Sequence, residues 1–109
     1  MAASAFSLLS DWYESNCNDD WEHGYGVKIE TLDNPGWLVQ IDLFGTLLAE
    51  TSFTRFSESC TEEGFPIGSA WIDCKREKTR WIGACDPKQI ERVVLIFIDW
   101  ASSAKVART

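Results

Sequence analysis

The sequence lacks several features that mark large classes of protein. It has no P-loop and no G-x-G-x-x-G motif, and no apolar run is long enough to span a membrane. Residues 1–15 lack the basic beginning of a signal peptide, and Asp11 interrupts their apolar part. We therefore expect a cytoplasmic protein without membrane contact, whose cysteines are reduced thiols packed as small apolar side chains. These cysteines are Cys17, Cys60, Cys74 and Cys85.

Basic residues are scarce in the first part of the chain. Residues 1–63 carry twelve acids and two bases, whereas residues 64–109 carry five acids and eight bases. The two parts therefore have formal charges of −10 and +3, and the whole chain has −7. Because phosphate groups attract basic faces, this balance disfavours nucleic-acid binding. It is compatible with a basic protein partner, although an acidic surface that only promotes solubility is a simpler interpretation.

The apolar content is sufficient for one folded core. Hydrophobic residues make up 45% of the 109 positions, and six of them are tryptophans. A chain of this length predicts a single domain over 1–109. Within it we place the core at about 5–101 and a frayed tail at 102–109.

Two segments have helical patterns. Residues 4–15 predict a short helix with Ser4 as its N-cap. Near the other end, Asp86 is the predicted N-cap of a second helix and Pro87 its first residue. The apolar positions recur every three or four residues in both segments: Ala5, Leu8, Leu9 and Trp12 in the first, and Ile90, Val93, Val94, Phe97 and Ala101 in the second.

The segments between these helices predict strands. Residues 25–32 and 37–44 alternate between apolar and polar side chains, and the turn between them contains Pro35 and Gly36. This pattern predicts a hairpin with a type II turn, in which glycine takes the positive φ.

The rest of the sheet is less sharply marked. Residues 46–53 predict a third strand, and residues 57–69 a surface loop. A second hairpin is expected from strands at 70–74 and 79–84, joined by a charged turn over 75–78. The predicted fold class is α+β, with an antiparallel sheet of about five strands and a helix near each end of the chain.

One polar stretch concentrates residues that could perform chemistry. Asp19, Asp20, Glu22 and His23 could form a small hydrolase or metal-dependent site. Their spacing matches neither a structural zinc site nor a known catalytic motif, so a polar loop whose carboxylates cap backbone amides is the alternative. We expect no catalytic residue, metal or cofactor.

Two other interpretations involve tryptophans. Trp71 and Trp81 share one predicted hairpin with four basic residues, Lys75, Arg76, Lys78 and Arg80, and such a mixture could bind single-stranded nucleic acid. A solvated charged turn beside core tryptophans is the alternative. A ligand pocket lined by residues such as Trp37 and Trp81 is a further hypothesis.

Two runs of the sequence together form a distinctive pattern. They are CNDDWEHGYGV at residues 17–27 and TLDNPGW at residues 31–37. With further elements, the pattern covers about residues 5–101 and resembles the immunity protein 53 family of bacterial polymorphic toxin systems; only the loop at 57–69 is weakly similar. The further elements are Trp12-Tyr13, Ile41-Asp42-Leu43, Gly45-Thr46, Trp71 with Cys74, Asp86-Pro87, Phe97 and Trp100.

The resemblance implies a cytosolic antidote without enzymatic activity. Such a protein binds a toxin made by its own cell or by sister cells and blocks the toxin's active site or substrate groove. Many of these toxins are nucleases with basic clefts, for which an acidic face would be a fitting partner. We hypothesise that the toxin is bound by the loop at 18–25 together with three nearby exposed acids, Glu30, Asp33 and Asp42. The loop residues in this hypothesis are Asp19, Asp20, Trp21, Glu22, His23 and Tyr25.

Overall fold

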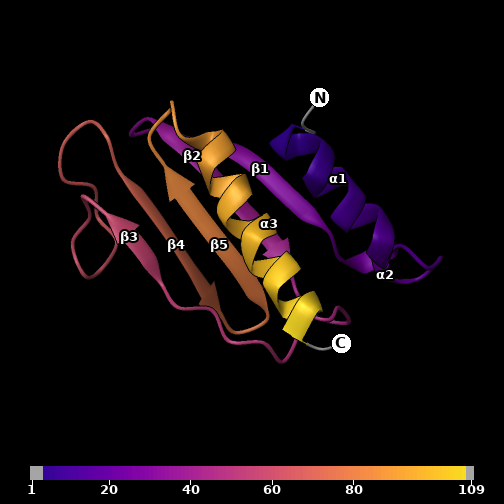
Figure 1. Ribbon diagram of the computed structural model, residues 1–109. Helices are drawn as coiled ribbons and strands as arrows, with labels where there is room; N and C mark the ends of the chain where they lie inside the picture. Colours follow the sequence, from indigo (N-terminus) through magenta and orange to yellow (C-terminus); the bar gives the residue numbers. More distant parts are fainter. Residues whose placement is uncertain (1–3, 108–109) are drawn as a thin grey trace.

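The fold is one antiparallel sheet with two helices packed on one of its faces. The computed structural model describes residues 4–107 (Figure 1). Five strands lie in the order β1-β2-β5-β4-β3, with every neighbouring pair antiparallel. The predicted α+β class, with five strands and a helix near each end, is confirmed. The elements are α1 (Ala5–Asn16), α2 (Trp21–Gly24), β1 (Val27–Leu32), β2 (Gly36–Asp42), β3 (Phe56–Glu58), β4 (Ile72–Glu77), β5 (Arg80–Cys85) and α3 (Ile90–Ala107).

The first helix begins where the sequence predicted. The side-chain oxygen of Ser4 accepts a hydrogen bond from the backbone N–H of Ser7, which satisfies one of the free donors at the helix start. Ala5 and Leu9 are buried under the helix. None of the helices within residues 4–107 combines the length and the apolar character that crossing a bilayer requires.

The first hairpin is confirmed, but its predicted type II turn is wrong. β1 and β2 pair from Val27 opposite Ile41 to Leu32 opposite Gly36, so three residues form the turn. Gly36 is the first residue of β2 and lacks the positive φ that a type II turn requires. Glycine is needed there for space, because a Cβ would overlap the carbonyl oxygen of Cys85.

The third strand predicted over 46–53 is not formed. Residues 44–50 make successive tight turns, and the first is closed by Thr46, whose N–H and hydroxyl both donate to the carbonyl of Leu43. The guanidinium of Arg76 then donates to the carbonyls of Leu48, Ala49 and Thr51. These local and long-range bonds satisfy the backbone without a neighbouring strand.

The second hairpin is confirmed with different boundaries. β4 extends to Glu77, so most of the predicted charged turn is strand, and only Lys78 and Thr79 reverse the chain. Lys78 has a φ of 55°. β3 begins at Phe56, so the first two residues of the predicted 57–69 loop belong to a short edge strand.

The last helix begins and ends later than predicted. The backbone N–H of Gln89 donates to the carbonyl of Asp86, which forms a turn before α3, and the helix itself starts at Ile90. It continues to Ala107, with Ala104 buried, so the frayed tail predicted from residue 102 is wrong through residue 107. Residues 108 and 109 lie outside the described part of the chain.

The core fills the space between the sheet and the two long helices. Trp81 and Phe97 are fully buried, and their ring centroids are 5.2 Å apart in an edge-to-face arrangement. α3 can approach β5 closely because a Cβ on Gly83 would collide with Val93. Each large side chain buried here stabilises the fold by about 1.5–3 kcal/mol.

The predicted packing of the cysteines as small apolar side chains is confirmed for two of the four, whereas Cys17 and Cys60 are only partly buried. All four cysteines are free, and two of them, Cys74 and Cys85, belong to the core. Burial raises the pKa of the Cys74 thiol to about 12 and that of Cys85 to about 11. Both are therefore neutral thiols at physiological pH.

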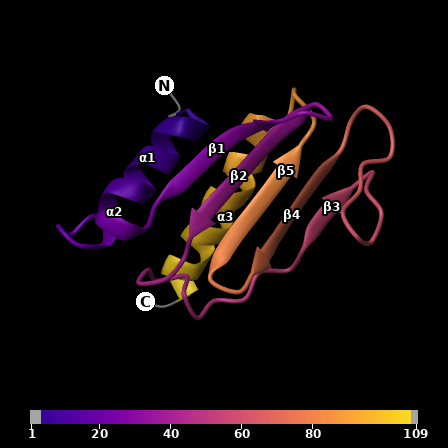
Figure 2. The same cartoon turned by 180° about the vertical axis from the view of Figure 1, so that it is seen from behind.

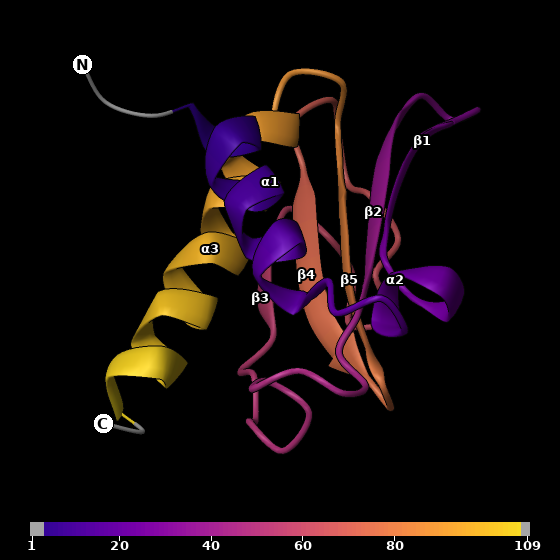
Figure 3. The same ribbon diagram turned by 90° about the vertical axis from the view of Figure 1, so that its right-hand side faces the viewer.

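One face of the sheet has no long helix packed on it, and one edge strand is open to solvent. α1 and α3 lie on the same side of the sheet, and neither lies on the opposite face (Figures 2 and 3). β1 is the edge strand next to α1, and its four central residues are exposed. The half-buried strand predicted here is thus more open to solvent, with Ile29 38% exposed.

A buried carboxylate joins the sheet to α3. Asp86 is 4% exposed, and one of its oxygens accepts bonds from the N–H of Trp71 at 2.9 Å and from Nε2 of Gln89 at 2.7 Å. The other oxygen accepts a bond from the N–H of Lys88. Burial disfavours the charged carboxylate, but these hydrogen bonds outweigh it and lower the pKa of Asp86.

We predict that Asp86→Ala lowers the free energy of unfolding by about 1–3 kcal/mol, because it leaves the N–H of Trp71 without its acceptor. Since the folded pKa lies below the unfolded value, the wild-type contribution is complete above about pH 4 and is lost as the pH falls further. Denaturant titrations at neutral pH and at about pH 3 should therefore show a smaller difference between the two proteins under acid conditions. The exposed Asp99→Ala serves as the control and should leave stability unchanged at neutral pH.

Candidate functional site

The polar stretch at 17–25 is a compact loop held by its own side chains. The side-chain oxygen of Asn18 accepts bonds from the N–H groups of Asp20 and Trp21, which starts the single-turn helix α2. The carboxylate of Glu22 reaches back and accepts bonds at 2.9 Å from the N–H groups of Asn18 and Asp19. Two side chains thus close the loop on itself.

Glu22 therefore has a structural role in this loop. Hydrogen bonds from backbone N–H groups lower the pKa of its carboxyl, with a smaller contribution from the neighbouring His23. Both carboxylate oxygens are engaged. Glu22 therefore fits the alternative interpretation of the sequence, in which the carboxylates of a polar loop cap backbone amides.

Trp21 anchors the loop to the body of the protein. It is only 6% exposed, and its indole N–H donates to the carbonyl of Phe44 at 2.7 Å. Its ring meets that of Trp12 edge to face and stacks beside Tyr25. The predicted contact residue Trp21 is thus placed beneath the loop rather than on its outer surface.

The outer surface of the loop carries acids with no structural partner. The carboxylates of Asp19 and Asp20 are exposed and accept no hydrogen bond within residues 4–107, and the exposed His23 side chain likewise makes none. Asp19 has a φ of 71°, a conformation that Asp, Asn and Gly tolerate better than other residues. Removing these charges would therefore leave the loop's own bonds intact.

An aromatic pair stands beside these acids. Tyr25 is 40% exposed and Phe44 is 55% exposed, and their ring centroids are 5.1 Å apart. Together with Asp20, His23 and neighbouring residues they line a shallow hollow of about 410 Å³. We call this surface the acid–aromatic patch, defined by Asp19, Asp20, His23, Tyr25 and Phe44.

Phe44 was missed in the analysis of the sequence, although a signal for it was present. It follows Leu43, the last apolar residue in the alternation of the strand predicted over 37–44, and so falls on the side of Gln40 and Asp42. An aromatic residue on a predicted polar side, just before Gly45, indicates exposure.

The remaining predicted residues do not join the patch. Asp42 is half-buried, where one oxygen accepts a bond from the N–H of Gly26 and the other pairs with Arg80 at 3.1 Å. Glu30 lies in the middle of β1, and Asp33 is exposed in the turn at the far end of that strand. The predicted acidic site is therefore a local patch followed by single charges along the edge of the sheet.

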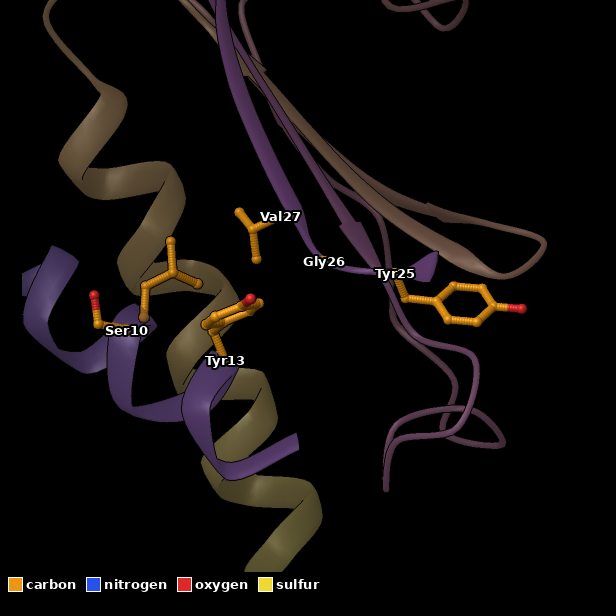
Figure 4. A pocket seen from close by; sticks show the side chains of 6 residues that line it. Ser10, Tyr13, Tyr25, Gly26 and Val27 are labelled. Carbon is orange, nitrogen blue, oxygen red and sulfur yellow. The ribbon is translucent and has the colours of Figure 1, made fainter. Parts of the chain in front are cut away.

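A second hollow lies between α1 and the start of β1. It has a volume of about 370 Å³, and its walls include Leu9, Ser10 and Tyr13 from the helix and Val27 from the strand. Figure 4 shows the side chains of Tyr13 and Val27 in the space between the two elements, whereas Tyr25 points away to the other side. The two hollows thus flank the segment Tyr25–Val27.

The other interpretations of the sequence receive no support from this geometry. Within residues 4–107, no three His, Cys, Asp or Glu side chains are grouped as metal ligands would be. Trp71 and Trp81 are buried, so they offer no stacking surface for nucleic acid. Trp81 lies in the core, Trp37 donates its indole N–H to the carbonyl of Pro87, and neither side chain lines the two hollows described above.

Comparison with known proteins gives one result. Residues 6–102 match the family model described as Immunity protein 53, which covers most of the chain and agrees with the resemblance seen in the sequence. No curated protein and no solved structure matches the chain.

We predict that Glu22→Ala lowers the melting temperature, because the N–H groups of Asn18 and Asp19 lose their acceptor. Asp20→Ala removes an equal charge from the same loop but no acceptor, so its melting temperature should stay at the wild-type value. Thermal unfolding followed by circular dichroism compares the two. An equal loss in both variants would contradict the structural role of Glu22.

Proposed function

Because this chain belongs to the immunity protein 53 family, we propose that it is an antidote that binds a cognate bacterial toxin and neutralises it without catalysing a reaction. The complex forms in the cytoplasm, where the toxin acts. The toxin is a basic protein, such as a nuclease whose substrate cleft attracts phosphate groups. The antidote occupies that cleft or covers it, and needs no metal or cofactor.

The observation that carries this proposal is the acid–aromatic patch. Protein interfaces favour exposed aromatic side chains surrounded by polar groups, because the rings supply contact area at a low cost in conformational entropy. Tyr25 and Phe44 provide such a pair, and the buried Trp21 stacks beside Tyr25 and donates a hydrogen bond to the backbone of Phe44. The two rings of the patch are thus exposed to solvent while a buried residue holds their backbone in place.

Charge supports the choice of a basic partner. The carboxylates of Asp19 and Asp20 accept no bond from other described residues, so they are free to pair with lysine or arginine. They belong to the part of the chain with a formal charge of −10. Complementary charge speeds the encounter of two proteins and makes the rate depend on salt.

We predict that the double variant Asp19→Asn, Asp20→Asn has an affinity at least about tenfold lower than wild type for the toxin domain encoded by the neighbouring gene. Asparagine keeps the side-chain shape and tolerates the positive φ of residue 19. Surface plasmon resonance at several salt concentrations measures the effect, which should be concentrated in the association rate and shrink as salt rises.

The matched control neutralises two acids elsewhere on the surface. Glu62 and Glu63 are exposed in the loop between β3 and β4, at the edge of the sheet opposite α2 (Figure 2). Glu62→Gln with Glu63→Gln changes the net charge by the same amount and should preserve the affinity. An equal loss of affinity in both double variants would mean that overall charge, and not the position of Asp19 and Asp20, determines binding. Toxicity that persists with this protein co-expressed in excess would contradict the antidote function for that toxin.

A second prediction concerns the aromatic half of the patch. Phe44→Ala should weaken toxin binding by about tenfold or more, as expected of a central aromatic contact. The acceptor for the indole N–H of Trp21 is the backbone carbonyl of residue 44, which alanine retains. Phe65→Ala removes a similarly exposed ring from the distant loop and should bind normally. Isothermal titration calorimetry compares the three proteins.

A further inference from the structure

The outer edge of β1 has backbone groups with no partner. β1 pairs only with β2, since it is the first strand of the sheet. The N–H of Asp42 donates to the carbonyl of Gly26, which marks these two residues as a hydrogen-bonded pair. Such pairs recur at every second residue of an antiparallel ladder. Lys28, Glu30 and Leu32 therefore bond to β2, while the N–H and C=O groups of Val27, Ile29 and Thr31 point away from the sheet.

The backbone of this edge is open to pairing with another chain. Proteins shield sheet edges with very short strands, prolines, bulges, covering segments or charged side chains, and of these devices β1 has only the charges of Lys28 and Glu30. The opposite edge follows this rule, because β3 has only three residues. β1 has six residues, contains no proline and pairs with β2 in regular register over its whole length. No residue between 4 and 107 supplies a hydrogen bond to its outer backbone groups.

The surroundings of the edge are complementary to an extended segment. On the helix side, Ile29 is 38% exposed, and the hollow walled by Leu9, Tyr13 and Val27 lies alongside. On the opposite side of the strand, Lys28 and Glu30 are exposed. At the Val27 end, the loop that carries the acid–aromatic patch lies beside the same edge (Figure 2). A strand placed against β1 would thus meet apolar, charged and backbone groups together.

We propose that β1 binds an extended segment of the toxin as a sixth strand of the sheet, an inference that rests on the function proposed above. The outer N–H and C=O groups of Val27, Ile29 and Thr31 bond to the toxin backbone. Alternate toxin side chains are apolar and enter the hollow beside Tyr13. The toxin side chains between these apolar ones face the other side of the sheet. There a basic toxin residue lies near Glu30, as basic residues do near the acids of the acid–aromatic patch.

A second copy of this chain fits the edge less well. Two identical edges that pair antiparallel are related by a two-fold axis perpendicular to the sheet, which puts the helices of both copies on the same side. α1 lies over the outer side of β1 (Figures 1 and 3). The two α1 helices would therefore compete for the same space above the joined strands. A single extended segment brings no helix with it.

Amide hydrogen exchange followed by NMR tests this inference directly. The probe is the catalytically inactivated toxin domain encoded by the neighbouring gene, added to the full chain. We expect the amides of Val27, Ile29 and Thr31 to exchange quickly in the free protein and at least about tenfold more slowly in the complex. The amides of Lys28 and Glu30 are already bonded to β2 and should be protected in both states. This alternation distinguishes a paired backbone from contact by side chains alone.

A proline variant gives a second readout. Thr31→Pro removes one outward N–H and no bond to β2, so the fold should persist, with its melting temperature as the check. We expect the affinity for the toxin domain to fall about five- to tenfold, whereas Thr31→Val keeps the N–H and should bind normally.

The outcomes separate this inference from the proposed function. A complex in which the amides of Val27, Ile29 and Thr31 keep their free exchange rates overturns the added strand but leaves toxin binding intact. Absence of any complex with the toxin domain overturns both. Protection that depends on protein concentration without toxin, together with a doubled mass in solution, would assign the edge to a second copy and also overturn the proposal.

Discussion

The position of α3 on the sheet depends on one buried carboxylate. Asp86 follows β5 directly, accepts the N–H of Trp71 at the start of β4 and holds Gln89 just before the helix. A single side chain thus links two central strands to the helix that covers them. Burial opposes the charged form of this carboxylate, but its hydrogen bonds outweigh that cost, so Asp86 stabilises the fold on balance. With α3 fixed, α1 packs beside it, and the core closes on one side only.

This one-sided architecture separates the residues that stabilise the fold from the recognition surface that we propose. The apolar residues of the central strands face the helices, as Trp81 and Phe97 show. The features available to a partner lie where that layer ends: the loop below α1, the aromatic pair of Tyr25 and Phe44, and the outer backbone of β1. The aromatic anchor Trp21 connects the two regions, since it contacts Trp12 inside and holds the carbonyl of Phe44 near the surface. Substitutions at the proposed recognition surface can therefore leave the core unaffected.

Much of the fold follows from local patterns, and the errors share a physical cause. α1 and the two hairpins were predictable because their apolar periodicity and the Ser4 cap act within a few residues. The strand predicted at 46–53 failed because Arg76, far along the chain, bonds the carbonyls of that segment. Gly36 is required by its proximity to Cys85, which a local turn rule does not contain. For the candidate site, the sequence predicted the loop itself, but the structural role of Glu22 and the exposure of Phe44 depend on contacts that spacing alone does not specify.

The loop at 18–22 divides its work between two sets of residues. Asn18 and Glu22 make the bonds that give the loop its shape, while the side chains of Asp19 and Asp20 make none. A chain built this way can exchange the second set freely, within the limit that the positive φ sets at residue 19. Mutations there alter the charge shown to a partner without a penalty in folding. The loop is thus a place where an antidote can follow a diverging toxin by single substitutions, each of them tolerated before it is selected.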